Sequence, residues 1–185
     1  GFENLEKHIE NCKKFGMTPI VGINNFHTDS QEEIDYIITR RAELGVTAVL
    51  NECWAKGGAG TTKLAEAVVA IIENKTNQFK PLYDWSISIE DKIKTIAMEI
   101  YGADGVDYSS KAKSDLKKIK DLALNTLPVC MAKTQKSFSD DEKKIGRPKG
   151  FNITVREFEF AVGAGFVIPI LGEIMRMPGL PPIPA

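Results

Sequence analysis

The chain has 185 residues, of which 43% are hydrophobic and 26% charged, so its composition is that of a globular protein. This length is enough for one substantial core or two small ones. The formal net charge of −1 gives no overall attraction to nucleic acid or to an anionic membrane, and we expect neither as a partner.

Cysteines and histidines are few and widely separated along the chain. The cysteines Cys12, Cys53 and Cys130 form neither a disulfide framework nor a zinc knuckle, which favours a reducing, cytoplasmic location. His8 and His27 are the two histidines, so we expect no transition-metal site. No apolar run approaches the roughly 20 residues that cross a bilayer.

The first 76 residues alternate between helical and strand-like patterns. Ser30, followed three residues later by Glu33, forms a capping box that begins a helix. Strand, loop and helix then follow twice, which predicts parallel β-α-β packing with ligands at the carboxyl ends of the strands. The helix over 63–75 is expected to bury Leu64, Val68, Val69 and Ile72. The other predicted elements are a helix over 3–15, strands over 19–23 and 46–50, and a helix that begins after Ser30 and ends at Gly45.

Two loops follow the two predicted strands, and each carries one large aromatic side chain. Phe26 lies in the loop 23–29, and Trp54 lies in the loop 52–60. Because the carboxyl ends of parallel strands meet at one sheet edge, the two aromatics are placed to hold a flat heterocycle from both faces. The alternative is that each aromatic is partly buried and closes the end of the sheet.

The second loop is rich in glycine and leads into a helix. Lys56, Gly57 and Gly58 follow Trp54, and their charge and backbone amides are suited to phosphate or carboxylate oxygens. The loop is not a Walker A motif, because GxxxxGK[ST] does not match it. A tight turn with a threonine cap is the alternative.

The second half of the chain, residues 77–185, is expected to form a separate subdomain. The sequence thus predicts an α/β fold, with a mainly parallel β-α-β portion over 1–76 followed by a smaller α/β C-terminal subdomain. The stretch 133–150 is charged and aperiodic, and we interpret it as a long surface loop. The remaining predictions are a helix from a capping box at Ser88 to Gly102, a helix over 110–124 with Ala112, Leu116, Ile119 and Ala123 inward, a buried strand over 127–132, a half-buried strand over 153–160, a further strand before Gly172, and a non-helical tail over 177–184.

Other reactive side chains have two interpretations each. His27 is either a general base or a surface histidine, and Cys130 is either a nucleophile or a buried small side chain. Lys133 and the nearby charges Asp140, Asp141 and Lys144 either reach a substrate or form a solvated charge run.

Several segments together resemble the formate–tetrahydrofolate ligase family. They include Gly22-Ile23-Asn24-Asn25-Phe26, Trp54-Ala55-Lys56-Gly57-Gly58-Ala59-Gly60 and Pro128-Val129-Cys130-Met131-Ala132-Lys133-Thr134-Gln135. The order and spacing of the motifs hold across essentially the whole chain. The other matching stretches are 4–11, 100–106, 137–141, 153–157, 163–166 and 177–181.

The resemblance implies an ATP-dependent reaction in which formate attacks the γ-phosphate to give formyl phosphate, and the N10 amine of tetrahydrofolate then attacks the formyl carbon. Family members are much longer, and this chain resembles only their carboxyl-terminal third. The abrupt start at Gly1 fits a piece of a longer protein. The resemblance therefore implies ATP, Mg²⁺, formate and tetrahydrofolate for the full-length enzyme, which is usually a homotetramer in bacteria, and no cofactor held by this part alone.

In the family, the positions of Phe26 and Trp54 clamp a planar ring of the folate or nucleotide. We therefore expect Phe26, Trp54, Lys56, Gly57 and Gly58 to bind folate or nucleotide, while no catalytic residue or metal ligand can be named. The family usually has proline where His27 stands and an acidic residue where Ala59 stands, so polar contacts from the second loop are in doubt. The alternative function is a structural and oligomerisation module with little ligand binding of its own.

Overall fold

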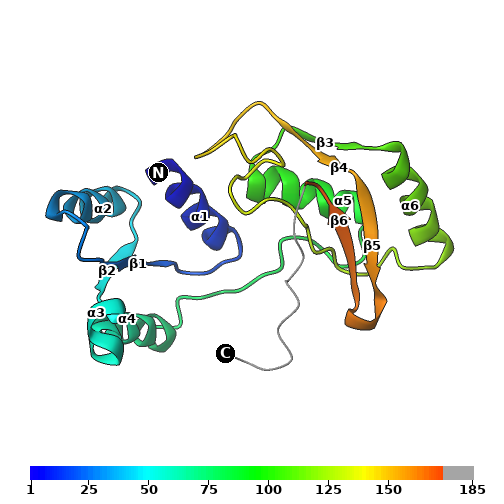
Figure 1. Cartoon of the computed structure of the whole chain (residues 1–185). Coiled ribbons are helices and arrows are strands. Elements are labelled where there is room, and N and C mark those ends of the chain that lie inside the picture. The colour runs from blue at the N-terminus through cyan, green and yellow to red at the C-terminus, as the bar shows by residue number, and fades with distance from the viewer. Residues whose placement is uncertain (173–185) are drawn as a thin grey trace, which may run out of the picture. The chain divides into compact units, whose positions relative to one another are not determined.

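The computed structural model describes residues 1–172, so the predicted tail at 177–184 lies outside the described residues. The chain divides into two compact units, the first spanning Gly1–Pro81 and the second beginning at Leu82 (Figure 1). The functional division expected after residue 76 stays a prediction. The α/β class is confirmed, because helices alternate with short parallel strand pairs in both units.

The first unit has the predicted β-α-β arrangement. Its two strands pair in parallel, and the Ser30–Glu33 capping box begins the helix between them. The bounds of the predicted helices and strands agree with the structure to within about two residues. The elements are α1 (Phe2–Lys14), β1 (Ile20–Asn24), α2 (Gln31–Glu43), β2 (Thr47–Asn51), α3 (Cys53–Lys56), the 3₁₀ segment η1 (Gly57–Thr61) and α4 (Thr62–Glu73).

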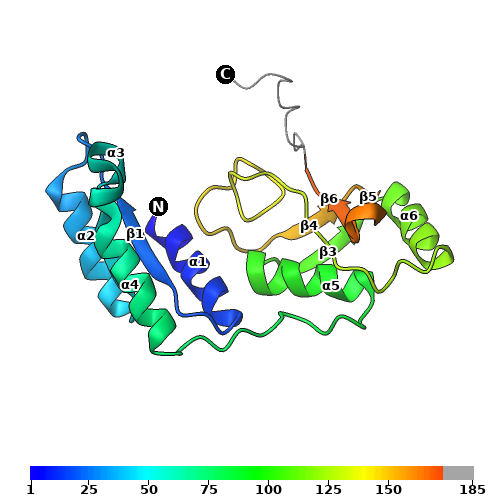
Figure 2. The same cartoon turned by 90° about the horizontal axis from the view of Figure 1, so that it is seen from below.

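The strand pair β1–β2 has helices on both faces. Alternate β1 residues Val21 and Ile23 are buried against Ile9 of α1 and Val46, together with side chains of α2. On the opposite face Gly22 lies against Leu64 of α4, so α4 covers that side (Figures 1 and 2). Asn24 is two residues beyond Gly22 and therefore leaves the strand on the α4 face.

The burial predicted for α4 is wrong in part. Leu64 is half-buried, but Val68, Val69 and Ile72 are 42%, 50% and 63% exposed. The two described strands lie about 4.8 Å apart, whereas a helix with its side chains is about 10 Å wide. This narrow sheet therefore covers a single stripe of α4 and leaves its other apolar side chains open.

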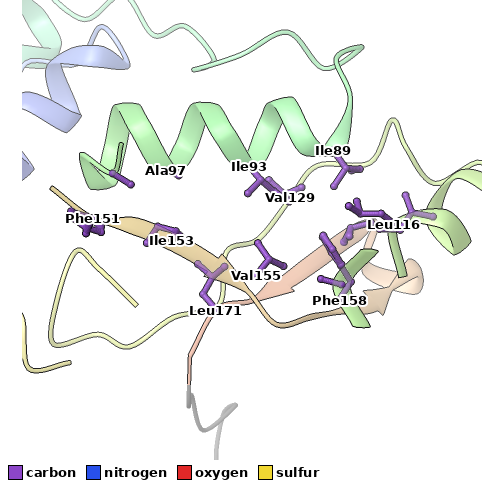
Figure 3. Packing of buried hydrophobic residues seen from close by; sticks show 14 residues of the cluster. Ile89, Ile93, Ala97, Leu116, Val129, Phe151, Ile153, Val155, Phe158 and Leu171 are labelled. Atoms are coloured by element: carbon purple, nitrogen blue, oxygen red, sulfur yellow. The ribbon is translucent and has the colours of Figure 1, made fainter. Parts of the chain in front are cut away.

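The second unit contains the larger buried cluster. Helix α5 and the segment η2 that continues it lie along the strands, and Ile93 of α5 and Ala97 of η2 face the side on which Ile153 and Val155 lie (Figure 3). The predicted Ser88 cap is present, since the Ser88 hydroxyl accepts from the Asp91 amide. The elements are α5 (Ile89–Thr95), the π-helical segment η2 (Ile96–Tyr101), β3 (Gly105–Tyr108), α6 (Ser110–Asp121), β4 (Asn152–Val155), β5 (Glu157–Ala161), the 3₁₀ segment η3 (Val162–Ala164) and β6 (Phe166–Ile170).

The strand predicted over 153–160 is divided between two sheets. Strand β4 pairs in parallel with β3, whereas β5 pairs antiparallel with β6. The change of sheet occurs at Arg156, whose amide donates to Ile170 O at 2.8 Å. In α6, Ala112, Leu116 and Ile119 are buried as predicted. Ala123 is exposed and beyond the helix end, with φ of 55°, so its inward placement is wrong.

The buried strand predicted over 127–132 is present only as two isolated bridges to β6. Val129 bridges Val167, and Ala132 bridges Ile170. Between them stands Pro169, which has no amide hydrogen to donate back to this segment. The ladder is therefore interrupted, and Cys130, at the interruption, is exposed rather than buried.

The stretch 133–150 has no helix or strand, as expected, but it is not wholly a surface loop. Ser137, Phe138 and Ser139 are buried. The Ser139 hydroxyl donates to Asp141 O at 2.9 Å, and the Lys133 ammonium donates to Thr134 O at 2.9 Å. These bonds satisfy the loop's buried polar groups from within, which lets an aperiodic segment pack.

Candidate functional site

The two aromatic loops leave the sheet at the same edge. In the parallel register Asn24 pairs with Asn51, so β1 and β2 end level with each other. One further backbone bond, from Asn25 N–H to Asn51 O at 2.9 Å, holds the start of the first loop to the end of β2. The geometry that sequence periodicity predicted for the site is therefore present.

Phe26 and Trp54 are brought together and both are accessible. Their ring centroids are 6.0 Å apart, and the side chains are 43% and 63% exposed. The rings are tilted by 57° rather than parallel. A flat molecule needs about 7 Å between two parallel rings, twice a carbon contact of about 3.5 Å. The pair must therefore open and rotate before it can hold a ring from both faces.

His27 lies against Trp54 in the position of a stacked ring. The centroids are 5.5 Å apart and the planes differ by 23°, so the imidazole covers part of the indole. The turn that presents Phe26 and His27 is closed by Asp29, whose carboxylate accepts from the Phe26 amide at 2.8 Å. Of the two interpretations of His27, its exposure favours the surface histidine, and the sequence gave no sign that it would stack on Trp54.

Lys56 forms a close ion pair within its own helical turn. Its ammonium lies 2.8 Å from both carboxylate oxygens of Glu52, at the i,i+4 spacing that favours such pairs. An anion at this point therefore competes with Glu52 for Lys56. The spacing of Glu52 and Lys56 was readable in the sequence, and it is the signal that the loop interpretation missed.

The glycine-rich segment is helical rather than an open loop. Gly57 has φ of 56°, a conformation that strains any side chain, whereas a Cβ at Gly58 meets nothing within 4 Å. A Cβ at Gly60 would lie 2.5 Å from Glu52 O, so only glycine allows this segment to cross the end of β2. A Cβ at Gly57 also meets nothing within 4 Å, so the backbone is open to a ligand at both predicted glycines.

The threonine cap, which belonged to the alternative interpretation of this loop, is absent at Thr61. Thr61 precedes α4 without a side-chain capping bond, and the Thr62 hydroxyl instead donates to Ala59 O at 3.3 Å. The first amides of α4 therefore have no side-chain acceptor from their N-cap residue.

Two other sequence candidates, Lys133 and Cys130, lie in the second unit near Tyr101. The Lys133 ammonium stands over the Tyr101 ring, 4.9 Å from its centroid, and burial lowers the pKa of Lys133 while Asp140 opposes this. Burial, with a further contribution from Cys130, raises the pKa of Tyr101 to about 12. The Lys133 ammonium also donates to two carbonyl oxygens of its own loop. In this structure Lys133 therefore stabilises that loop.

Within residues 1–172, no three His, Cys, Asp or Glu side chains gather closely enough to hold a metal ion. None of the helices in that range has the length and apolar character to span a bilayer.

The fold and the paired loops define an α/β protein with two exposed aromatic side chains at the carboxyl edge of parallel strands. A family model described as formate–tetrahydrofolate ligase matches residues 1–185. The chain therefore belongs to the formate–tetrahydrofolate ligase family. Membership implies, for the full enzyme, a ligase reaction in one-carbon metabolism that uses ATP, formate and tetrahydrofolate.

Proposed function

We propose that this chain supplies the planar-ring site of a formate–tetrahydrofolate ligase, with Phe26 and Trp54 as the two walls that hold a folate or nucleotide ring. The observation that carries the proposal is the exposure of both aromatics, 6.0 Å apart, at the edge where parallel sheets place ligands. Lys56, Gly57 and Gly58 border the same site. Gly58 offers backbone approach, and Lys56 offers a charge once it leaves Glu52.

The proposal includes the setting in which the site works. The chain alone is catalytically incomplete, and ATP, Mg²⁺ and formate are used by the full-length enzyme, a cytoplasmic homo-oligomer. The three exposed, free cysteines Cys12, Cys53 and Cys130 support a reducing compartment. Turnover of formate, ATP and tetrahydrofolate by the chain alone would contradict the claim of incompleteness.

The first prediction is that Trp54→Ala weakens binding of the ring ligand. Stacking on one aromatic contributes about 1–3 kcal/mol, which corresponds to roughly 5- to 150-fold in Kd. Isothermal titration of the chain with tetrahydrofolate and with ADP measures the effect. Because Trp54 is 63% exposed and contributes little to the core, the fold is expected to persist, as circular dichroism can check.

Trp85 provides the matched control for this experiment. It is also an exposed tryptophan, at 55%, but it lies in the second unit beside Tyr83. Trp85→Ala should leave both titrations unchanged. An equal loss in the two variants would argue against a specific role for Trp54.

A structural module remains the alternative function, and one observation favours it. The exposed side chains Val68, Val69 and Ile72 of α4 form an apolar face typical of a contact surface. The same titration separates the two functions. If neither ligand gave a binding heat or a change in tryptophan fluorescence, the structural module would be favoured over the planar-ring site.

The second prediction concerns His27, which competes with a ligand for the face of Trp54. An aromatic pair of this kind contributes about 0.5–1.5 kcal/mol, so His27→Ala should tighten ring binding by roughly 2- to 10-fold. His8→Ala is the control, since it removes the other histidine, which stands on α1 and not in either loop. Weaker binding in His27→Ala would mean that the imidazole contacts the ligand instead of competing with it.

A further inference from the structure

Two asparagine side chains meet at the ends of β1 and β2, directly before the aromatic loops. The Asn51 amide nitrogen donates to Asn24 Oδ1 at 2.9 Å and to Cys53 Sγ at 3.4 Å. Asn24 is two residues before Phe26, and Cys53 is adjacent to Trp54. One side chain therefore links the starts of both loops.

Asn51 is an unusual residue for this buried position. Its side chain is only 9% exposed, and its Oδ1 atom is covered and has no hydrogen-bond partner within residues 1–172. A buried acceptor without a partner destabilises a fold, and an apolar side chain of similar size would avoid that cost. The fold alone does not account for Asn51, whereas its bonds to Asn24 and Cys53 give it a positioning role.

Asn24 differs from Asn51 in being exposed. Because Asn51 holds the Asn24 oxygen, the two hydrogens of the Asn24 amide nitrogen are directed away from that bond. The side chain leaves β1 at the sheet edge from which Phe26 and Trp54 rise. A ligand ring at the aromatic pair would thus have a fixed hydrogen-bond donor beside its edge.

We propose that Asn24 is a specificity-determining residue of the ring-binding site and that Asn51 is its positioning residue. The inference rests on the proposed function, because it assumes a flat ring at Phe26 and Trp54. The ligand class is a heterocycle with an acceptor on its edge, either a carbonyl oxygen or a ring nitrogen. Pterin and adenine both carry such acceptors, so the two are separated by experiment.

The third prediction, Asn24→Asp, tests the proposal by reversing the polarity of one atom. Aspartate keeps an oxygen that accepts from the Asn51 amide, but it presents a second oxygen where the donor stood. We expect binding to weaken at least tenfold, with the thermal midpoint unchanged. The measurement is isothermal titration of the chain with tetrahydrofolate in one arm and ADP in the other, and the arm that weakens identifies the ring.

Asn25→Asp is the matched control, because it introduces the same charge one residue further along. Successive side chains leave an extended segment on opposite sides, so this carboxylate should leave binding within about twofold. Asn51→Asp is the second variant. It removes the donor to Asn24, so Asn24 should turn its nitrogen inward and its oxygen outward, and binding should weaken as in Asn24→Asp.

The outcomes separate this inference from the proposed function. In one outcome the parent chain binds, Trp54→Ala weakens binding, and Asn24→Asp binds like the parent. The inference about Asn24 is then overturned, and the proposed planar-ring site of Phe26 and Trp54 is supported. If Asn24→Asp lowers the thermal midpoint well below that of Asn25→Asp, the bond to Asn51 is not preserved and the inference is again overturned. A parent chain that binds neither ligand overturns both.

Discussion

Replacing Lys92 with alanine is expected to destabilise the second unit by about 4 kcal/mol, a large part of the 5–15 kcal/mol typical of a domain. Lys92 is fully buried, and its ammonium donates to Thr126 O and Leu127 O at 3.0 Å and to Asn125 O at 3.5 Å. Burial lowers the pKa of Lys92, and Asp84 opposes this. Three carbonyls rather than a carboxylate hold this buried cation.

The expected loss combines two physical effects. Alanine removes a buried aliphatic stem, at about 0.8 kcal/mol per methylene, and it removes hydrogen bonds to a charged group that contribute about 1.5–3 kcal/mol. Lys92→Met keeps most of the stem and loses the ammonium, so it should fall between wild type and alanine. Chemical denaturation followed by circular dichroism measures all three proteins.

Lys94→Ala is the control for Lys92→Ala, because it changes an exposed lysine of the same helix α5. It should alter the free energy of unfolding by less than about 0.5 kcal/mol. If Lys92→Ala proves no worse than Lys94→Ala, the segment 125–127 does not depend on this cation, and the role assigned to Lys92 is wrong.

Helix caps and hydrophobic periodicity in the sequence predicted most helices and strands of the fold. The Ser30–Glu33 capping box, the Ser88 cap and the two parallel strands follow from short-range chemistry, which is present in full in the sequence. Long-range pairing was harder to predict. The segment 127–132 has a strand-like composition, but its ladder depends on Pro169, about 40 residues further along, and that dependence has no local signal.

The placement of the two aromatic loops was predicted from the sequence, and their side-chain contacts were not. The β-α-β alternation predicts that the two strands run parallel, so Phe26 and Trp54, which follow the strand ends, were expected at one edge of the sheet. The stacking of His27 and the bond between Asn24 and Asn51 depend on side-chain rotamers after the strands pair. Burial on α4 was misjudged for a related reason, since periodicity identifies an apolar face but not the width of the sheet that covers it.

The fifth prediction is that Asp115→Asn destabilises the second unit by about 2 kcal/mol at neutral pH. The Asp115 side chain is fully buried on α6, where it accepts from Lys111 at 2.5 Å, from Lys118 at 3.2 Å and from the Phe158 amide at 3.3 Å. Asparagine keeps one oxygen that can accept from the Phe158 amide and from Lys111, but it loses the carboxylate charge and the second oxygen, which accepts a charge-assisted bond from Lys118. Such bonds contribute about 1.5–3 kcal/mol in buried settings, and the exposure of both lysines reduces this figure.

The loss should depend on pH in a defined direction. Burial alone would raise the pKa of Asp115, but Lys111, the Phe158 amide and Lys118 outweigh it and hold the pKa below its ordinary value. A carboxyl with a depressed folded pKa contributes stability above its unfolded pKa of about 3.9 and loses it as pH falls through the folded pKa. The difference between wild type and Asp115→Asn should therefore be constant from about pH 5 to 7 and shrink below about pH 4.

Asp121→Asn makes the same change at an exposed position at the end of α6. Carboxylates are unfavourable near a helix C-terminus, so this control should be neutral or slightly stabilising at pH 7. Denaturation of the three proteins at pH 7 and at pH 3 gives the comparison. A wild-type advantage over Asp115→Asn that grew on acidification would mean that the folded pKa of Asp115 is raised rather than lowered, because a carboxyl with a raised folded pKa gains stability as pH falls. The contacts of Lys111 and Lys118 with Asp115 would then not stabilise the carboxylate enough to offset its burial, and α6 would be held to β5 by the apolar contacts of Leu116 and Phe158 in the buried cluster.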